Sequence, residues 1–167
     1  MENEKSSQKL SLLKYWPLFA LILVAALAAT ALAKTDQWRL LGWMHFFMGF
    51  FLCQFAMLKL FHPISFADGF QKYDLIAIRS RAYAYLYPII ELALGLAYLS
   101  FFMPTLTYIL TITILGIGAI GVIKALIKGL DVRCACMGTI LDVPLSTVTF
   151  TEDLGMVVMA LFLLFWK

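Results

Sequence analysis

The chain has 167 residues, of which 63% are hydrophobic and 14% charged, and its mean hydropathy is +0.91. Soluble domains are about 45–50% apolar and about 25% charged, so this composition excludes an ordinary soluble domain and predicts an integral membrane protein in a lipid bilayer. The formal net charge is only +3, and no basic stripe interleaved with exposed aromatic residues is present, so we expect no nucleic-acid partner.

The chain begins with a polar segment, residues 1–14, which we interpret as a cytoplasmic tail. The first apolar run follows over residues 15–33 and is long enough to cross a hydrocarbon core of about 30 Å at 1.5 Å per residue. We therefore predict a first transmembrane helix and a short outer loop over residues 15–39.

The first run also permits a second interpretation. Lysines precede the run, and Ala31-Leu32-Ala33 matches the cleavage pattern of a secretory signal peptide. The run is longer than the usual apolar region of such a peptide, and Tyr15 and Trp16 form an aromatic anchor at its start. We therefore favour a retained helix.

Four further apolar runs cover residues 40–61, 83–103, 106–126 and 150–166. The expected fold is all-α: an integral membrane helical bundle of about five transmembrane helices, with one domain over residues 40–167.

Two local signals refine this expectation. Pro63 blocks continuation of the second helix, and the FADGFQKY stretch that follows it is amphipathic, which predicts an interfacial segment. Thr149 and Glu152 have the spacing of a capping box, which predicts that the last helix starts at Phe150.

Basic residues predict the orientation of the bundle. If the N-terminus is cytoplasmic, only Lys34, Arg39 and Lys167 of the 13 Lys and Arg residues lie on the outer side. This asymmetry follows the positive-inside rule, so we expect a cytoplasmic N-terminus and a cytoplasmic loop before the last helix.

That loop carries Cys134-Ala135-Cys136, the sharpest chemical feature of the sequence. Two thiols separated by one residue can close a strained and therefore labile disulfide, and Arg133 favours the reactive thiolate. The same pair can instead bind a soft ion, Cu(I) or Hg(II), with Met137 as a thioether ligand. A third interpretation is that both cysteines are small buried hydrophobic residues.

Glu91 is the second feature, because it lies inside an apolar run where a carboxylate is costly and usually has a partner. Lys59, near the inner end of the preceding helix, can reach it by snorkelling. Glu91 is therefore either part of a proton or cation site beneath the C-x-C loop or half of a structural pair.

Three other residues are weaker candidates. Cys53 is expected to pack in the core, with a role as a third thiol as the alternative. His45 and His62 lie near opposite ends of one helix, too far apart to share a metal ion, and we interpret both as interfacial groups. The sequence shows no Ser-His-Asp set, phosphate-binding glycine loop or H-E-x-x-H motif.

Three segments, residues 47–74, 83–99 and 133–160, resemble the MauE branch of the DoxX-like membrane proteins. The shared elements are K-L-x-x-P-x-x-F-A, Y-P-x-x-E-L-x-L-G and C-x-C-x-G-T. The resemblance covers about three quarters of the chain and leaves the first helix as an addition to a four-helix bundle.

This family is redox-associated, and MauE is linked to maturation of methylamine dehydrogenase, an enzyme rich in disulfides. The resemblance implies a multi-pass protein of a bacterial inner membrane, with Cys134 and Cys136 as the redox pair and Glu91 as the carboxyl of the third helix.

We therefore expect a thiol–disulfide redox protein, with disulfide-exchange oxidoreductase activity left open and a thioredoxin-like partner. The alternatives are a copper or mercury carrier served by a metal chaperone, and an accessory subunit of a membrane complex.

Overall fold

A computed structural model describes residues 16–33, 39–128 and 145–166 of the chain. Cys134, Cys136 and Met137 lie outside the described residues, as does the predicted tail over 1–14. All regular secondary structure in the described part is helical, with α2 (Trp16–Ala33), α3 (Arg39–Phe61), α4 (Pro63–Phe70), α5 (Arg81–Leu99), α6 (Pro104–Ile127) and α7 (Leu145–Phe165).

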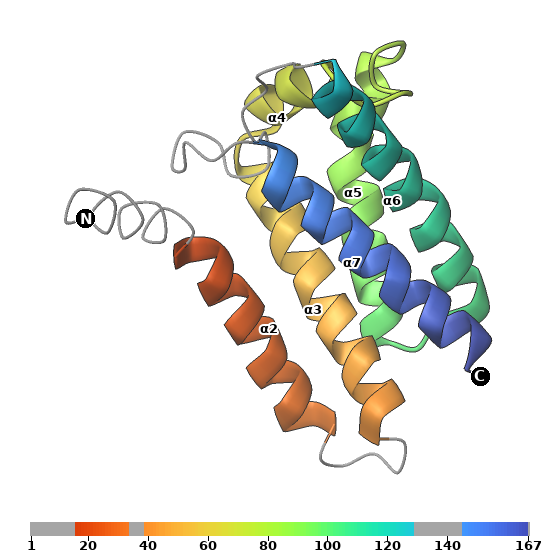
Figure 1. The fold of residues 1–167 in the computed structure, drawn as a ribbon. Helices are drawn as coiled ribbons and strands as arrows, with labels where there is room; N and C mark the ends of the chain where they lie inside the picture. The colour runs from red at the N-terminus through yellow and green to blue at the C-terminus, as the bar shows by residue number, and fades with distance from the viewer. Residues whose placement is uncertain (1–15, 34–38, 129–144, 167) are drawn as a thin grey trace, which may run out of the picture.

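The long helices form a bundle that fits a lipid bilayer. Within the described ranges, α2, α3, α5 and α6 are each long and apolar enough to cross a membrane. The fifth long helix, α7, lies along α6, while α5 packs against α3 and α2 lies outside α3 (Figure 1). The predicted all-α membrane bundle of about five helices is thus confirmed, and the protein is a multi-pass membrane protein.

Helices α3 and α5 approach so closely that each needs a glycine at the contact. A Cβ atom built on Gly95 of α5 would come within 2.7 Å of the Cys53 Sγ and 3.0 Å of the Gly49 carbonyl oxygen. A Cβ atom on Gly49 would in turn meet the Leu99 side chain at 2.6 Å. In a membrane the hydrophobic effect does not drive helices together, so their association depends on close van der Waals packing. Small residues such as glycine allow this packing.

Helix α2 packs on the bundle through a narrow stripe of small side chains. Ala25, Ala29 and Ala33 are buried and spaced four apart, so they share one helix face. The Trp43 Nε1 of α3 donates a hydrogen bond of 3.0 Å to the Thr30 hydroxyl of α2. Most of the remaining surface of α2 is exposed and apolar, as suits contact with lipid.

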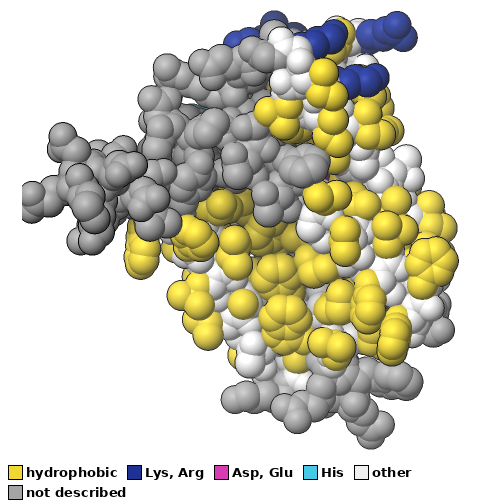
Figure 2. All heavy atoms as spheres, viewed as in Figure 1, with side chains coloured by type: hydrophobic (Ala, Val, Ile, Leu, Met, Phe, Trp, Pro, Cys, Tyr) yellow, Lys and Arg dark blue, Asp and Glu magenta, His cyan; other side chains and the backbone are white. Residues whose placement is uncertain are grey.

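One end of the bundle is basic. Figure 2 shows blue Lys and Arg side chains at the top, where α4, the start of α5 and the end of α6 meet, and hydrophobic side chains below them. The exposed basic residues at this end are Lys72, Arg79, Arg81, Lys124 and Lys128. The turn at the opposite end, residues 99–104, carries no charged residue.

Helix α4 confirms the amphipathic segment predicted after Pro63. It buries Phe66, Ala67 and Phe70 and exposes its other face, including Ile64. The predicted start of the last helix is wrong, because α7 already begins at Leu145. Residues 149–152 therefore lie within a helix, where the backbone N–H groups have helical partners and need no cap.

The close approach of α3 and α5 makes a direct prediction. Gly95→Ala should force the two helices apart and destabilise the protein by about 1–3 kcal/mol, as overpacking does in other cores. Gly116→Ala in α6 is the matched control, because a Cβ there meets no atom within 4 Å. Thermal unfolding of both purified variants in detergent measures the difference, and equal midpoints would contradict the packing described for Gly95.

Candidate functional site

A buried ion pair joins α3 to α5 inside the bundle. The Lys59 Nζ donates to both carboxylate oxygens of Glu91, each at 2.7 Å. The two side chains are only 3% and 1% exposed, so neither charge is solvated by water. Lys59 and Glu91 are therefore partners, as predicted from the cost of a carboxylate in an apolar helix.

Two acidic residues of α7 complete this site. The Glu152 Oε1 lies 3.7 Å from the Lys59 Nζ, and Glu152 is buried. Asp153, also buried, packs against α6, where a Cβ atom on Gly118 would lie 3.1 Å from the Asp153 Oδ2. We call Lys59, Glu91, Glu152 and Asp153 the Lys59 cluster.

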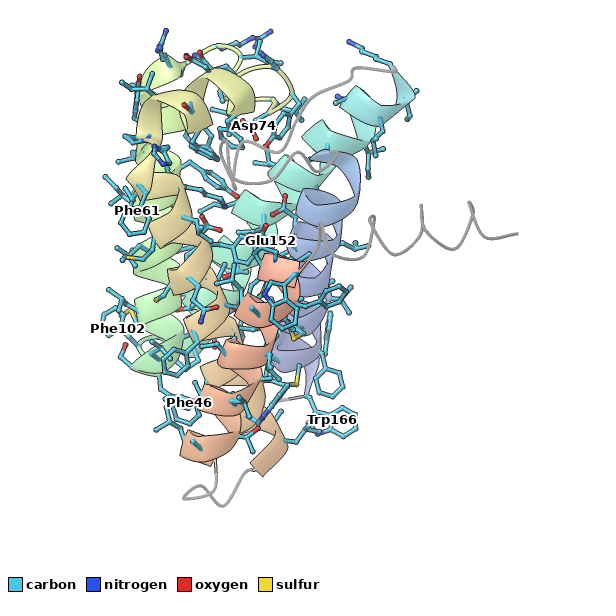
Figure 3. All side chains as sticks on the ribbon, turned by 90° about the vertical axis from the view of Figure 1, so that its left-hand side faces the viewer. Phe46, Phe61, Asp74, Phe102, Glu152 and Trp166 are labelled. Carbon is cyan, nitrogen blue, oxygen red and sulfur yellow. The ribbon has the colours of Figure 1, made fainter. Side chains whose placement is uncertain are left out.

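Aromatic rings enclose the ammonium group of Lys59. Its Nζ lies 5.2 Å from the ring centroid of Tyr87 and 5.7 Å from that of Phe66, both within the range of cation–π attraction. Phe66 belongs to α4, so that short helix covers the cluster from the basic end of the bundle. Glu152 itself lies between Asp74, near α4, and Phe46, near the opposite end (Figure 3).

The buried apolar core of the described residues consists of two clusters. One lies beneath α4 and includes Phe70, Tyr87 and Val122, whereas the other extends toward the opposite end and includes Phe55 and Met156. Transfer of an ion from water into an apolar core costs several kcal/mol. The charged groups of the Lys59 cluster offset this cost by attracting one another.

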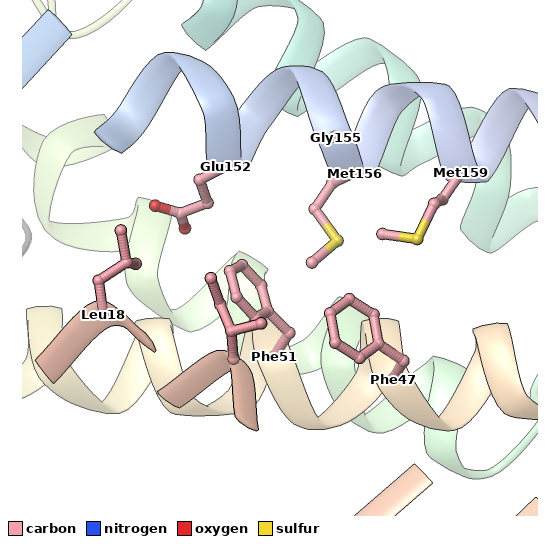
Figure 4. A pocket seen from close by; sticks show the side chains of 8 residues that line it. Leu18, Phe47, Phe51, Glu152, Gly155, Met156 and Met159 are labelled. Atoms are coloured by element: carbon pink, nitrogen blue, oxygen red, sulfur yellow. The ribbon is translucent and has the colours of Figure 1, made fainter. Parts of the chain in front are cut away.

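A cavity of about 190 Å³ adjoins the cluster between α2, α3 and α7. In Figure 4, Glu152, Met156 and Met159 of α7 point toward Phe47 and Phe51 of α3, with α2 beside them. Glu152 therefore faces both the cavity and Lys59. Glu152 was not predicted to be a site residue, because the only role visible in the sequence was the capping box.

The structure places two of the weaker candidate residues, Cys53 and His45. Cys53 is half-buried and is the one free cysteine among the described residues; its Sγ packs against Gly95, which fits the expected core role. His45 is buried, so the expectation of an interfacial group is wrong for it.

His45 links α3 to the turn between α5 and α6. Its Nδ1 lies 3.3 Å from the Tyr98 carbonyl oxygen, which can only accept, so Nδ1 donates. In neutral imidazole the Nε2 then accepts from the Tyr108 hydroxyl. The ring also stacks on Phe101, at 4.5 Å between centroids. These contacts indicate a structural histidine far along α3 from Lys59.

Asp74 holds the loop between α4 and α5 in place. Its Oδ1 accepts from the backbone N–H groups of Ile76 and Ala77, at 2.9 and 2.8 Å. Burial raises the pKa of the Asp74 carboxyl, and these two hydrogen bonds oppose that rise. Gly121 of α6 lies against the backbone here, since a Cβ on it would meet the Tyr73 carbonyl oxygen at 2.7 Å.

The described residues contain no group of three or more His, Cys, Asp and Glu residues that could hold a metal ion. The segment with Cys134, Cys136 and Met137 joins the end of α6 to the start of α7. Glu152 lies about two helical turns into α7. In sequence it therefore follows closely after the segment that contains the two cysteines.

A bundle of apolar helices around a buried lysine and several carboxyls defines the class: a multi-pass membrane protein with an intramembrane charge cluster. The model of a family described as methylamine utilisation protein MauE matches residues 37–166. The chain therefore belongs to the MauE family, with α2 outside the matched region. No curated protein and no solved structure gives a match to this chain.

The Lys59–Glu91 pair predicts a strong energetic coupling. Lys59→Met leaves buried carboxyls without their ammonium group and should cost about 3–5 kcal/mol, whereas the double variant Lys59→Met/Glu91→Leu should recover part of the loss. Unfolding of the wild type, both single variants and the double variant gives the coupling as a double-mutant cycle.

The exposed pair Arg81–Asp68 provides the control for this cycle. Its charged atoms are 2.8 Å apart, nearly as close as those of Lys59 and Glu91, but the side chains are 56% and 54% exposed. Water and salt screen such pairs, so its cycle should show little coupling. Equal coupling for the two pairs would show that burial does not strengthen the Lys59–Glu91 interaction.

Proposed function

We propose that the protein is a membrane-embedded thiol–disulfide redox protein in which Cys134 and Cys136 cycle between a dithiol and a disulfide. The observation that carries this proposal is the Lys59 cluster, in which charged groups from α3, α5 and α7 meet inside an apolar bundle. The segment with both cysteines leads directly into α7, which supplies Glu152 and Asp153.

The chemistry of the thiols requires groups that handle protons. Oxidation of a dithiol forms one S–S bond and releases two electrons and two protons. A carboxyl can accept such a proton, and Lys59 lies within 4 Å of carboxylate oxygens of both Glu91 and Glu152. As either carboxyl gains a proton, the Lys59 charge can pair with the other one, so the cluster can exchange protons without isolating a buried charge.

The basic end of the bundle supports one orientation in the membrane. Exposed Lys and Arg residues gather where α6 ends, and cytoplasmic loops carry such an excess. This supports a cytoplasmic N-terminus and a cytoplasmic C-x-C segment in a bacterial inner membrane. The thiols would then exchange electrons with a reduced cytoplasmic partner of the thioredoxin type, and the family name supports a role in methylamine utilisation.

Alkylation of the purified protein tests the redox cycle. In a Cys53→Ala background, reduced protein should take up two alkyl groups and oxidised protein none, because both thiols enter one disulfide. Intact mass measures the shift directly, and Cys134→Ser/Cys136→Ser is the control that should show no labelling in either state.

The same samples separate the competing functions. If both cysteines stay reactive thiols under every oxidant tested, the redox proposal is wrong. Binding of one Cu(I) per chain that disappears in Cys134→Ser/Cys136→Ser, together with thiols that never form a disulfide, would favour the metal carrier. If cells that carry Cys134→Ser/Cys136→Ser behave in every assay as cells with the wild-type protein do, the result would favour an accessory subunit.

A further inference from the structure

The cavity between α2, α3 and α7 has the composition of a binding site for a lipid-soluble molecule. Its volume is about 190 Å³, and the described residues that line it are apolar except for the carboxyl of Glu152. Binding sites for small molecules commonly combine apolar walls with a few polar groups that orient the ligand. The cavity lies among membrane-spanning helices, so a ligand would reach it from the lipid phase.

The walls favour a flat ring. Phe47 and Phe51 stand one helical turn apart on α3, with ring centroids 5.7 Å apart and planes inclined by 24°. Met156 and Met159 face them from α7 (Figure 4). Thioether side chains adapt their shape and make favourable contacts with rings, so this arrangement can hold a ring between aromatic and sulfur-containing surfaces.

Glu152 specifies the polar group of the ligand. A protonated carboxyl donates a hydrogen bond to a carbonyl oxygen, and an ionised carboxyl accepts one from a hydroxyl group. A carboxyl that gains and loses protons therefore matches a ring oxygen that alternates between carbonyl and hydroxyl. Among lipid-soluble compounds, quinones and their reduced quinols have this property.

We propose that the cavity binds the ring of a lipid-soluble quinone, with one ring oxygen hydrogen-bonded to Glu152. The role of this quinone as electron acceptor rests on the proposed function, whereas its binding does not. In the complete reaction, the Cys134 and Cys136 thiols form one S–S bond and lose two electrons and two protons. The quinone gains both, and its two carbonyl oxygens become hydroxyl groups.

Tryptophan fluorescence can measure the binding. Trp43 stacks on the cavity residue Phe47, with ring centroids 5.2 Å apart, so a quinone in the cavity should quench its emission. Titration of the purified full-length protein with a short-tailed ubiquinone analogue should give saturable quenching with one site per chain.

Gly155 offers a position from which a larger side chain can extend into the cavity. This glycine lines the cavity, and a Cβ atom on it meets nothing within 4 Å. The leucine side chain of Gly155→Leu would occupy space that the ring needs, so the dissociation constant for the quinone should rise by about tenfold or more. Gly116→Leu in α6 is the matched control, since its Cβ also meets open space, and it should bind as the wild type does.

A second variant tests the role of the carboxyl. Glu152→Gln keeps an N–H donor for the quinone carbonyl, so it should retain binding of the oxidised ring but slow reduction of the quinone by the thiols. Non-saturable quenching, or equal quenching in Gly155→Leu and the wild type, would show that the quinone only partitions into the detergent and would overturn the proposal. Retention of phospholipid that Gly155→Leu abolishes, without competition by quinone, would assign the cavity to an acyl chain instead.

The failure of either proposal can be recognised separately. Cys134→Ser/Cys136→Ser should bind the quinone as the wild type does, because the substitutions leave Glu152 and the aromatic and thioether side chains of the proposed site unchanged. Saturable binding by a protein whose thiols never cycle would leave the cavity assignment intact and refute the redox function. Cycling thiols without quinone binding would refute the cavity assignment alone.

Discussion

The bundle buries the charge of Lys59 among apolar helices, and three helices supply or compensate that charge. Lys59 is 3% exposed and has no access to water, so its charge has to be compensated by carboxyls from other helices. Glu91 supplies the nearest compensation, at 2.7 Å, and Glu152 lies at 3.7 Å. Since these groups come from α3, α5 and α7, the ion pair and its acidic neighbour fix how three helices are placed relative to one another.

The packing of small residues serves the same arrangement. Glycines bring α3 and α5 together one helical turn from Glu91, and Gly118 leaves room on α6 for the Asp153 carboxyl. The alanine stripe of α2 lets that helix pack closely on the bundle, and Leu18 and Ile22 of the same helix line the cavity beside Glu152. Each of these contacts depends on the absence of a bulky side chain, so the cluster owes its geometry to the smallest residues around it.

Composition and apolar runs were sufficient to predict the membrane bundle, because a helix has to satisfy its own backbone within lipid. The pairing of Lys59 with Glu91 could also be predicted, since a carboxylate in an apolar run requires a partner. The contribution of Glu152 could not, because its role depends on how α7 lies against α3, which spacing along the chain does not reveal. The local capping pattern at Thr149 was misleading because the helix continues through it. The cavity and the His45–Tyr108 contact likewise arise only when distant helices come together.

The proposed redox cycle requires the carboxyls of the Lys59 cluster to exchange protons with the Cys134–Cys136 pair. Infrared difference spectroscopy of the purified protein during electrochemical reduction and reoxidation tests it most directly, because the carbonyl stretch of a protonated carboxyl is resolved from other bands. Such proton exchange should give a carboxyl band that changes reversibly with the redox state of the thiols and that is lost or shifted in Glu91→Gln or Glu152→Gln. Thiols that cycle without any change in a carboxyl band would contradict it.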